Sequence, residues 1–269
     1  QKGKSISDFQ KLINNATTFD VENVKSLGGV IQDTVRKLSL GIVEDRLDLP
    51  WKNVNKLLNG FIPGDLIVIG AKPGVGKSSF SFDLLYYYAM QGIPSLLFSL
   101  EMPPWRILPR IVALHKRKDS RLCNDVETLS DAYKELKNVP FYLAYKYDKP
   151  NWNFISDTIR HCVKRYGIQF LVFDNLHFLC RSLNKQTEEV SVTIQNFKLL
   201  AEELAIPILV VARPRKTGSK IISGEDLKDS ADIEGDADTI ILLSRERKKS
   251  VGGEDIEGIF EPRTLVDVS

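Results

Sequence analysis

The segment "LIVIGAKPGVGKSS", Leu66 to Ser79, decides the fold that this chain can adopt. Its first five residues are apolar and rich in β-branched side chains, which predicts a short buried strand. Residues 77–90 then carry apolar side chains at helical spacing, so we expect a helix there. The glycine-rich stretch between them therefore forms the turn from a strand into a helix.

This turn has the pattern of a phosphate-binding loop, which asks for Gly, four residues and then Gly-Lys-Ser/Thr. Gly76, Lys77 and Ser78 match, whereas Ala71 at the first position is a relaxed form. Gly74 and Gly76 let the backbone turn tightly, so that N–H groups converge on an anion at a helix N-terminus. We expect Lys77 to contact the β- and γ-phosphates of a nucleotide and Ser78 to bind Mg²⁺. The alternative is an ordinary glycine-rich turn that carries a lysine. The predicted nucleotide-binding residues here are Ala71, Lys72, Pro73, Gly74, Val75, Gly76, Lys77, Ser78 and Ser79.

Length and composition restrict the class of protein. The 269 residues are 43% hydrophobic and 27% charged, which suits one large globular domain. A net charge of +2 excludes a uniformly basic surface, so any nucleic-acid contact has to be local. Cys123, Cys162 and Cys180 form no CxxC or metal-binding spacing, which favours buried thiols in a reducing compartment. We see no signal peptide and no apolar run near the ~18 residues that cross a membrane. Because the chain begins at Gln1, we expect a fragment of a longer protein.

Strands and helices alternate along most of the chain. This alternation predicts an α/β fold whose central sheet is mostly parallel and carries helices on both faces. Residues 256–260 and 264–268 are short and close together, which predicts a C-terminal antiparallel hairpin. The other expected strands are 95–100, 168–174, 207–212, 239–243 and a short edge strand at 141–144; the expected helices are 103–118, 126–137, 152–166 and one around 194–204.

Residues 1–45 look separate from the domain formed by residues 46–269. Within the first segment, residues 26–42 place Val30, Ile31, Val35 and Leu38 on one helical face, and Gly28 and Gly29 should separate this helix from what precedes it. Two interpretations stay open. The helix either docks on a neighbouring subunit or packs on its own domain.

Three polar residues follow buried strands, and ligands of parallel sheets bind at the carboxyl ends of strands. Asp174 is placed to hold Mg²⁺, and Glu101 to orient and deprotonate an attacking water. Arg213 is placed to sense the γ-phosphate. For the carboxylates, the alternatives are a turn or cap residue and a solvated loop residue.

Several ordered motifs resemble the DnaB-type replicative helicases, a family that includes Twinkle and the phage primase–helicases. "FSLEMPPWRILPR" (98–110) is similar to their segment around the catalytic glutamate, and "FDNLHFL" (173–179) to their magnesium-aspartate strand. "RPRK" (213–216) and the acidic "DLKDSADIEGDADTI" (226–240) match as well. The resemblance extends from about Leu49 to the end of the chain.

This resemblance implies a RecA-like motor that forms a homo-hexameric ring, hydrolyses ATP or another NTP with Mg²⁺, threads single-stranded DNA and unwinds a forked duplex. A primase domain or primase partner is possible in such a system, and no membrane is involved. By position, Lys77 and Ser78 carry over as phosphate and magnesium contacts, Glu101 as the base, Asp174 as the magnesium aspartate, and Arg110 as a nucleotide-site arginine.

The chain departs from the family pattern at three places. Arg213 stands where the family has Gln or His, and His177 stands where Gln is common. The family supplies an arginine finger in a late Lys-x-Arg pattern, but this chain ends at Ser269, with Arg263 as a fallback. Because such a finger is worth ~10³ or more in rate, we expect this chain to hydrolyse ATP poorly.

Two basic loops are predicted to grip the DNA phosphates, because rings hold a single strand mainly by its backbone. The alternative is a pair of solvated charged loops. The predicted DNA-binding residues are Arg181, Lys185, Arg215, Lys216 and Lys220.

Two other functions remain open: a recombinase-like or clock-type ATPase that does not unwind DNA, and a nucleotide-binding platform without catalysis. Unwinding of a forked duplex separates the first of these from a helicase. The replacement Glu101→Gln separates the second, because a pure binding module would lose nothing. A bacterial or phage replication fork in the cytoplasm fits the sequence, and so does the mitochondrial matrix.

Overall fold

The computed structural model describes residues 26–39, 46–145, 151–179, 186–212, 231–245 and 264–268. The chain divides into two compact units, Gln1–Asp45 and Arg46–Ser269. Within the part of the chain that is described, no helix combines the length and the apolar character needed to cross a bilayer.

In the first unit, the structure describes helix α2 (Leu27–Ser39). Gly28 and Gly29 lie inside this helix, so the expectation that they separate it from the preceding residues is wrong. The backbone N–H of Gly29 donates to Ser26 Oγ at 3.2 Å, and this cap satisfies an N–H that a helix start otherwise leaves unpaired. The side chains of Leu27, Ile31 and Val35 are four residues apart and all exposed, which gives α2 an apolar face.

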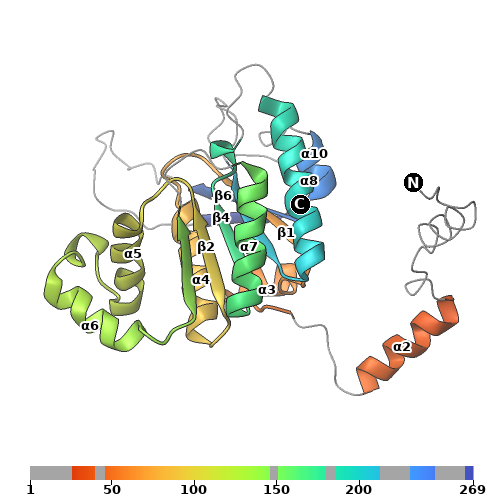
Figure 1. The fold of residues 1–269 in the computed structure, drawn as a ribbon, viewed down its shortest axis with the longest axis horizontal. Coiled ribbons are helices and arrows are strands. Elements are labelled where there is room, and N and C mark those ends of the chain that lie inside the picture. Colours follow the sequence, from red (N-terminus) through yellow and green to blue (C-terminus); the bar gives the residue numbers. More distant parts are fainter. Residues whose placement is uncertain are drawn as a thin grey trace, which may run out of the picture. The chain divides into compact units, whose positions relative to one another are not determined.

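A seven-stranded sheet forms the centre of the second unit (Figure 1). Its strands are β1 (Leu66–Ala71), β2 (Ser95–Ser99), β3 (Phe141–Tyr145), β4 (Phe170–Asp174), β5 (Ile208–Ala212), β6 (Thr239–Arg245) and β7 (Thr264–Val268). Their order is β3-β2-β4-β5-β1-β6-β7. All neighbours from β3 to β6 are parallel, and β7 is antiparallel to β6. The expected antiparallel C-terminal strand is thus present, but it pairs with β6; the expected hairpin partner, 256–260, lies outside the described residues.

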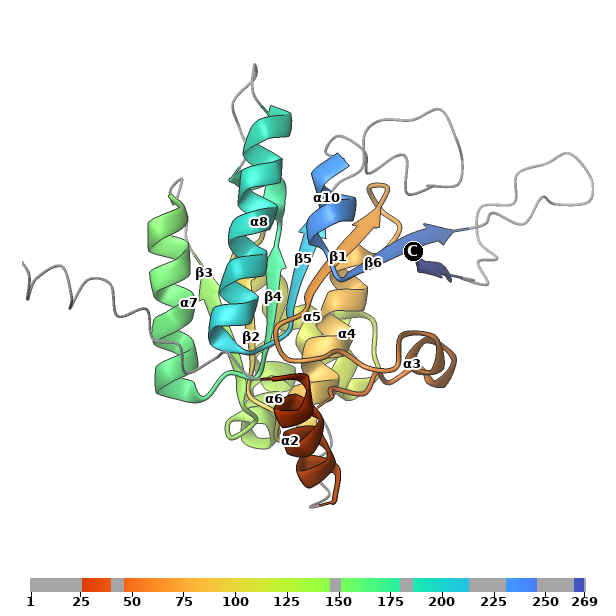
Figure 2. The same cartoon turned by 90° about the vertical axis from the view of Figure 1, so that its right-hand side faces the viewer.

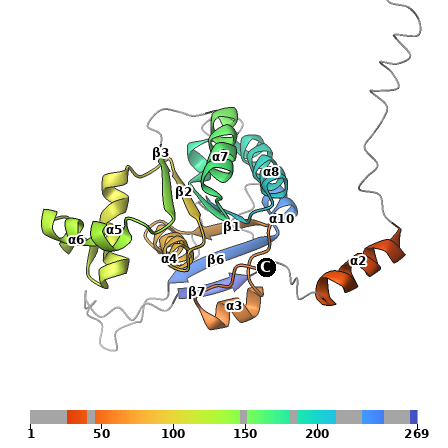
Figure 3. The ribbon, with the colours of Figure 1, turned by 60° about the horizontal axis from the view of Figure 1, so that its bottom comes forward.

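Helices cover both faces of this sheet. Figure 3 shows α7, α8 and α10 on one side of the strands and α3, α4 and α5 on the other. The helices are α3 (Lys52–Leu58), α4 (Lys77–Met90), α5 (Pro104–Lys116), α6 (Val126–Leu136), α7 (Trp152–Tyr166), α8 (Gln186–Leu204) and α10 (Ala231–Asp236), with short 3₁₀ turns η2 (Ser120–Leu122) and η3 (Leu176–Phe178). This arrangement confirms the predicted α/β fold.

Two apolar layers hold the sheet between its helices. Because successive strand residues point to opposite faces, Phe173 packs toward α8, where its ring lies 4.7 Å from that of Phe197. Phe170, three residues earlier in β4, packs on the other face, where its ring lies 4.8 Å from that of Tyr88 in α4. Strands buried on both faces explain why their sequences read as continuous apolar runs.

Helix α3 escaped prediction from the sequence. It is short and has no buried residue, so its apolar spacing is weak. Contacts outside its own sequence hold it: Asn55 Oδ1 accepts from Leu49 N at 2.8 Å, and Trp51, just before the helix, stacks on Phe80 with ring centroids 4.5 Å apart. Asn59 ends the helix in the left-handed conformation, which is tolerated best by Gly and Asn.

Candidate functional site

The strand order brings the predicted polar residues to one edge of the sheet. β2, β4, β5 and β1 are neighbours, and Figure 2 shows β4, β5 and β1 pointing the same way, so their carboxyl ends share that edge. Asp174 is the last residue of β4, and Glu101 follows β2 by two residues. The two strands are also joined at this edge, because Leu100 N donates to the Asp174 carbonyl at 2.7 Å.

The loop between β1 and α4 has the geometry of an anion cradle. Gly74 and Gly76 adopt positive φ angles of 80° and 122°, which L side chains rarely adopt. A Cβ added at either glycine would meet nothing within 4 Å, so the backbone conformation, and not a lack of space, requires glycine. Helix α4 begins at Lys77 without a side-chain cap, which leaves N–H groups of its first turn for a ligand.

Three predicted residues meet beside this loop. The Lys77 ammonium donates to the carbonyl of Ala71 across the loop. Ser78 Oγ donates to Asp174 Oδ2 at 3.3 Å, and Asp174 is only 1% exposed. A hydroxyl beside a carboxylate offers the oxygen donors that Mg²⁺ prefers, and Mg²⁺ in nucleotide sites takes only one or two protein ligands. These side chains therefore fit the predicted metal.

Glu101 and Asn175 face each other across the same edge. The exposed Glu101 accepts a hydrogen bond at Oε2 from Nδ2 of Asn175, which follows Asp174 directly and is 1% exposed. A carboxylate held at the rim of the cradle is suited to accept a proton from water. The sequence analysis missed Asn175, and its position next to the predicted metal aspartate was the available signal.

Other predicted residues lie elsewhere or outside the described ranges. Arg110 is exposed on α5, so its part in nucleotide binding stays a prediction. Cys123 is a buried free thiol, whereas Cys162 is only half-buried, and burial raises the pKa of its thiol. The residues that lie outside the described part of the chain are Cys180, Arg181, Lys185, Arg213, Arg215, Lys216, Lys220 and Arg263.

Part of the acidic segment 226–240 supports the strand that carries the loop. Asp238 Oδ2 accepts from the N–H of Leu66, the first residue of β1, at 2.7 Å. Lys198 of α8 donates to the same carboxylate at 2.7 Å and to the Gly64 carbonyl at 3.2 Å. Asp238 thus fixes the start of β1, at the opposite end of the strand from the cradle.

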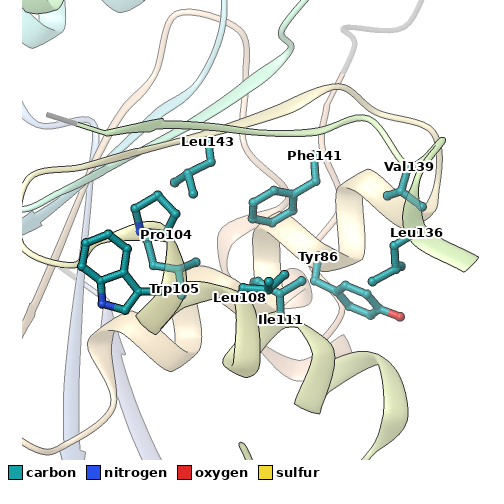
Figure 4. A pocket seen from close by; sticks show the side chains of 10 residues that line it. Tyr86, Pro104, Trp105, Leu108, Ile111, Leu136, Val139, Phe141 and Leu143 are labelled. Atoms are coloured by element: carbon teal, nitrogen blue, oxygen red, sulfur yellow. The ribbon is translucent and has the colours of Figure 1, made fainter. Parts of the chain in front are cut away.

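An open apolar pocket of about 500 Å³ lies away from the cradle, between α5, β3 and the end of α6 (Figure 4). Trp105, at its rim, is 62% exposed, and Leu108 is exposed as well. Behind it, His115 of α5 is hydrogen-bonded to the Tyr86 hydroxyl at 2.9 Å and to Glu135 of α6, which ties three helices together. The lining residues are Tyr86, Pro104, Trp105, Ile107, Leu108, Ile111, Leu136, Val139, Phe141 and Leu143.

Comparison with protein families identifies the kind of domain. The family model described as "DnaB-like helicase C terminal domain" matches residues 47–260. The chain belongs to this family. The Replicative DNA helicase DnaB of Leifsonia xyli subsp. xyli is 29% identical over 212 residues, which cover 73% of this chain and 46% of that protein. The DnaB helicase of Mycoplasma genitalium is 27% identical, with coverage of 97% and 60%. The chain thus spans about half the length of the curated relatives that it matches.

Solved structures confirm the RecA-like fold of this DnaB-like domain. One, whose title describes an ATPase domain, superposes with a TM-score of 0.69 at 19% identity, covering 91% of this chain and 95% of that one. A DnaB-like replicative helicase, whose title also names its interactions with primase, superposes with a TM-score of 0.68 at 18% identity, covering 98% and 72%. At these identities the likeness speaks for the fold alone.

Proposed function

We propose that this DnaB-like domain is the motor of a replicative-type DNA helicase, which hydrolyses ATP to translocate on single-stranded DNA and to unwind duplex DNA as a hexameric ring. Family membership over residues 47–260 supports this function, as do the names of the curated relatives. The single observation that carries it is the meeting of loop, hydroxyl and carboxylate at Lys77, Ser78 and Asp174.

In this proposal, each residue at the edge has one task. The backbone amides of residues 71–79 and the Lys77 ammonium bind the phosphates of ATP. Ser78 and Asp174 hold Mg²⁺, which neutralises charge on the phosphates when bound. Glu101 accepts a proton from the attacking water. Arg110 and Arg213 are assigned to the nucleotide by the family resemblance.

Strand displacement on a forked duplex tests the function. We expect the chain to separate the strands only with ATP and Mg²⁺, and Glu101→Gln to lose hydrolysis while it still binds nucleotide. ATP hydrolysis without strand displacement would favour the alternative, a recombinase-like or clock-type ATPase. Hydrolysis unchanged by Glu101→Gln would overturn the assignment of the base.

DNA contact is assigned to Arg181, Lys185, Arg215, Lys216 and Lys220, because a ring grips a single strand mainly by its phosphates. Replacing both Lys216 and Lys220 by Ala should weaken single-strand binding and make its salt dependence shallower. An unchanged salt slope would contradict this assignment.

Assembly is assigned to α2 and the apolar pocket. We propose that α2 of one copy docks on the pocket of a second copy, because α2 exposes an apolar face and the pocket exposes Trp105 and Leu108. Deleting residues 1–45 should lower the mass of the assembly measured by light scattering with nucleotide. An unchanged mass would exclude docking by α2.

The setting of the motor follows from the relatives. Bacterial replicative helicases favour a replication fork in the cytoplasm, and the DnaB-like structure described with primase favours a primase as partner. Co-sedimentation with a primase from the same source would test the partner. Both assignments are separate from the hydrolysis site.

A further inference from the structure

We propose that Asn175 is a positioning residue that holds the Glu101 carboxylate in place for hydrolysis, and that the chain accepts a cost in folding stability for it. The proposal rests on the proposed function, in which Glu101 is the base. It concerns a residue that neither the loop motif nor the metal aspartate accounts for.

The first observation is the contrast in burial across one hydrogen bond. Asn175 is 1% exposed and sits directly after β4, so its backbone is fixed by the sheet. Glu101 is exposed on the segment after β2 and has a long side chain with considerable rotamer freedom. Asn175 Nδ2 donates to Glu101 Oε2. A fixed buried group therefore restrains an exposed mobile one.

The second observation is that the other half of the amide is left unsatisfied. Asn175 Oδ1 is buried and has no hydrogen-bond partner among the described residues. Turning the amide over would place Oδ1 against the Glu101 carboxylate, two acceptors facing each other, so the arrangement with Nδ2 toward Glu101 is the favourable one. A buried acceptor without a partner lowers folding stability. A residue serving stability alone would not carry this defect.

The third observation is the position of Asn175 in the chain. Asp174 contacts Ser78 on the phosphate side, and the next residue contacts Glu101 on the water side. Two consecutive residues at the end of β4 thus fix the relative placement of the metal-binding pair and the base. Because Lys77, Ser78 and the loop bind the phosphates without Asn175, its loss should change kcat and leave nucleotide binding alone.

The test compares turnover with stability. Asn175→Leu keeps a similar volume but has no donor and no unsatisfied oxygen, whereas Asn175→Ser keeps a smaller donor. We expect kcat for ATP hydrolysis to fall about tenfold or more in Asn175→Leu and less in Asn175→Ser, because misplaced catalytic groups lose large factors in rate. The KM for ATP should stay within about twofold. Thermal stability should follow the opposite order, with Asn175→Leu at or above the parent and Asn175→Ser below it.

Two controls separate this proposal from the function on which it rests. Ser81→Ala removes another buried, unpartnered oxygen, on α4, and should leave kcat unchanged. Glu101→Gln should abolish hydrolysis, and adding Asn175→Leu to it should cause no further loss. If Glu101→Gln is inactive but Asn175→Leu keeps the parental kcat, the positioning role is overturned and the function stands. Parental turnover in Glu101→Gln overturns both. A joint loss of kcat, ATP affinity and thermal stability in Asn175→Leu indicates a structural role and also overturns the proposal.

Discussion

The cradle edge of the sheet and the apolar flank around α5 place their functional groups in opposite ways. At the cradle edge, Asp174 is 1% exposed and belongs to a strand paired on both sides. On the flank, Trp105 is 62% exposed and lines a pocket that is open to solvent. The first region has the fixed polar groups that a small anion needs, whereas the second offers apolar surface that only another surface can cover.

The two regions are joined by one short segment. Helix α5 begins at Pro104, three residues after Glu101, and the same helix supplies the rim of the pocket. Substitutions at the edge should therefore change catalysis without changing assembly, and substitutions on the flank should change assembly first. The following experiments test that separation.

The largest effect is expected from Lys77→Ala. Its ammonium lies beside the loop, and removing one preorganised donor from a charged transition state costs roughly 10²–10³ in rate. Steady-state ATP hydrolysis measures the loss, with Lys134→Ala as the control, because Lys134 is an exposed partner of Asp131 on α6. An unchanged oligomer mass in Lys77→Ala would support the separation. Hydrolysis at the parental rate would remove the loop from the mechanism.

A smaller effect is expected from Ser78→Ala. Ser78 Oγ contacts Asp174, and losing one of two protein oxygen donors should raise the Mg²⁺ concentration for half-maximal hydrolysis by about tenfold, or about 1.4 kcal/mol. Titrating Mg²⁺ at fixed ATP measures the change, and Thr158→Ala, an exposed hydroxyl on α7, is the matched control. An identical Mg²⁺ curve in Ser78→Ala would place the metal elsewhere.

The sequence was sufficient to predict what depends on local pattern. Strands such as 170–174 are buried on both faces and so read as apolar runs, and the loop motif needs specific residues at fixed spacing. It could not reveal Asn175, because the partner of an amide is decided by which strand ends become neighbours. α3 was missed because contacts such as Trp51 on Phe80 hold it, and the pocket was missed because it is assembled from separate elements.

On the flank, the expected effect is on assembly alone. Replacing Ile31 and Val35 by Ser removes two exposed apolar side chains from α2, and Leu108→Ser removes one from the pocket. Either change should weaken association about tenfold, or about 1.4 kcal/mol, because each deletes apolar area that docking would bury. Light scattering over a concentration series measures it. Leu199→Ser, on the exposed side of α8, is the control. Equal loss in the control would mean that exposed leucines anywhere on the surface affect association, which would remove the special role of the pocket.

The smallest effect is expected at an ion pair that belongs to neither region. Arg160 of α7 donates to both carboxylate oxygens of Glu203 of α8, at 2.7 and 2.8 Å, and these hydrogen bonds lower the pKa of Glu203. A lowered folded-state pKa gives stability that is present above the ordinary carboxyl pKa and is lost as the pH falls through the folded value. Both side chains are exposed, so Glu203→Gln should cost less than about 1 kcal/mol at neutral pH and almost nothing in acid. Urea unfolding at the two pH values measures this, with Glu127→Gln on α6 as the control. Because this pair contacts neither cradle nor pocket, ATP turnover and oligomer mass should both stay at parental values; a change in either would show that the two regions respond to general stability, and would undo their separation.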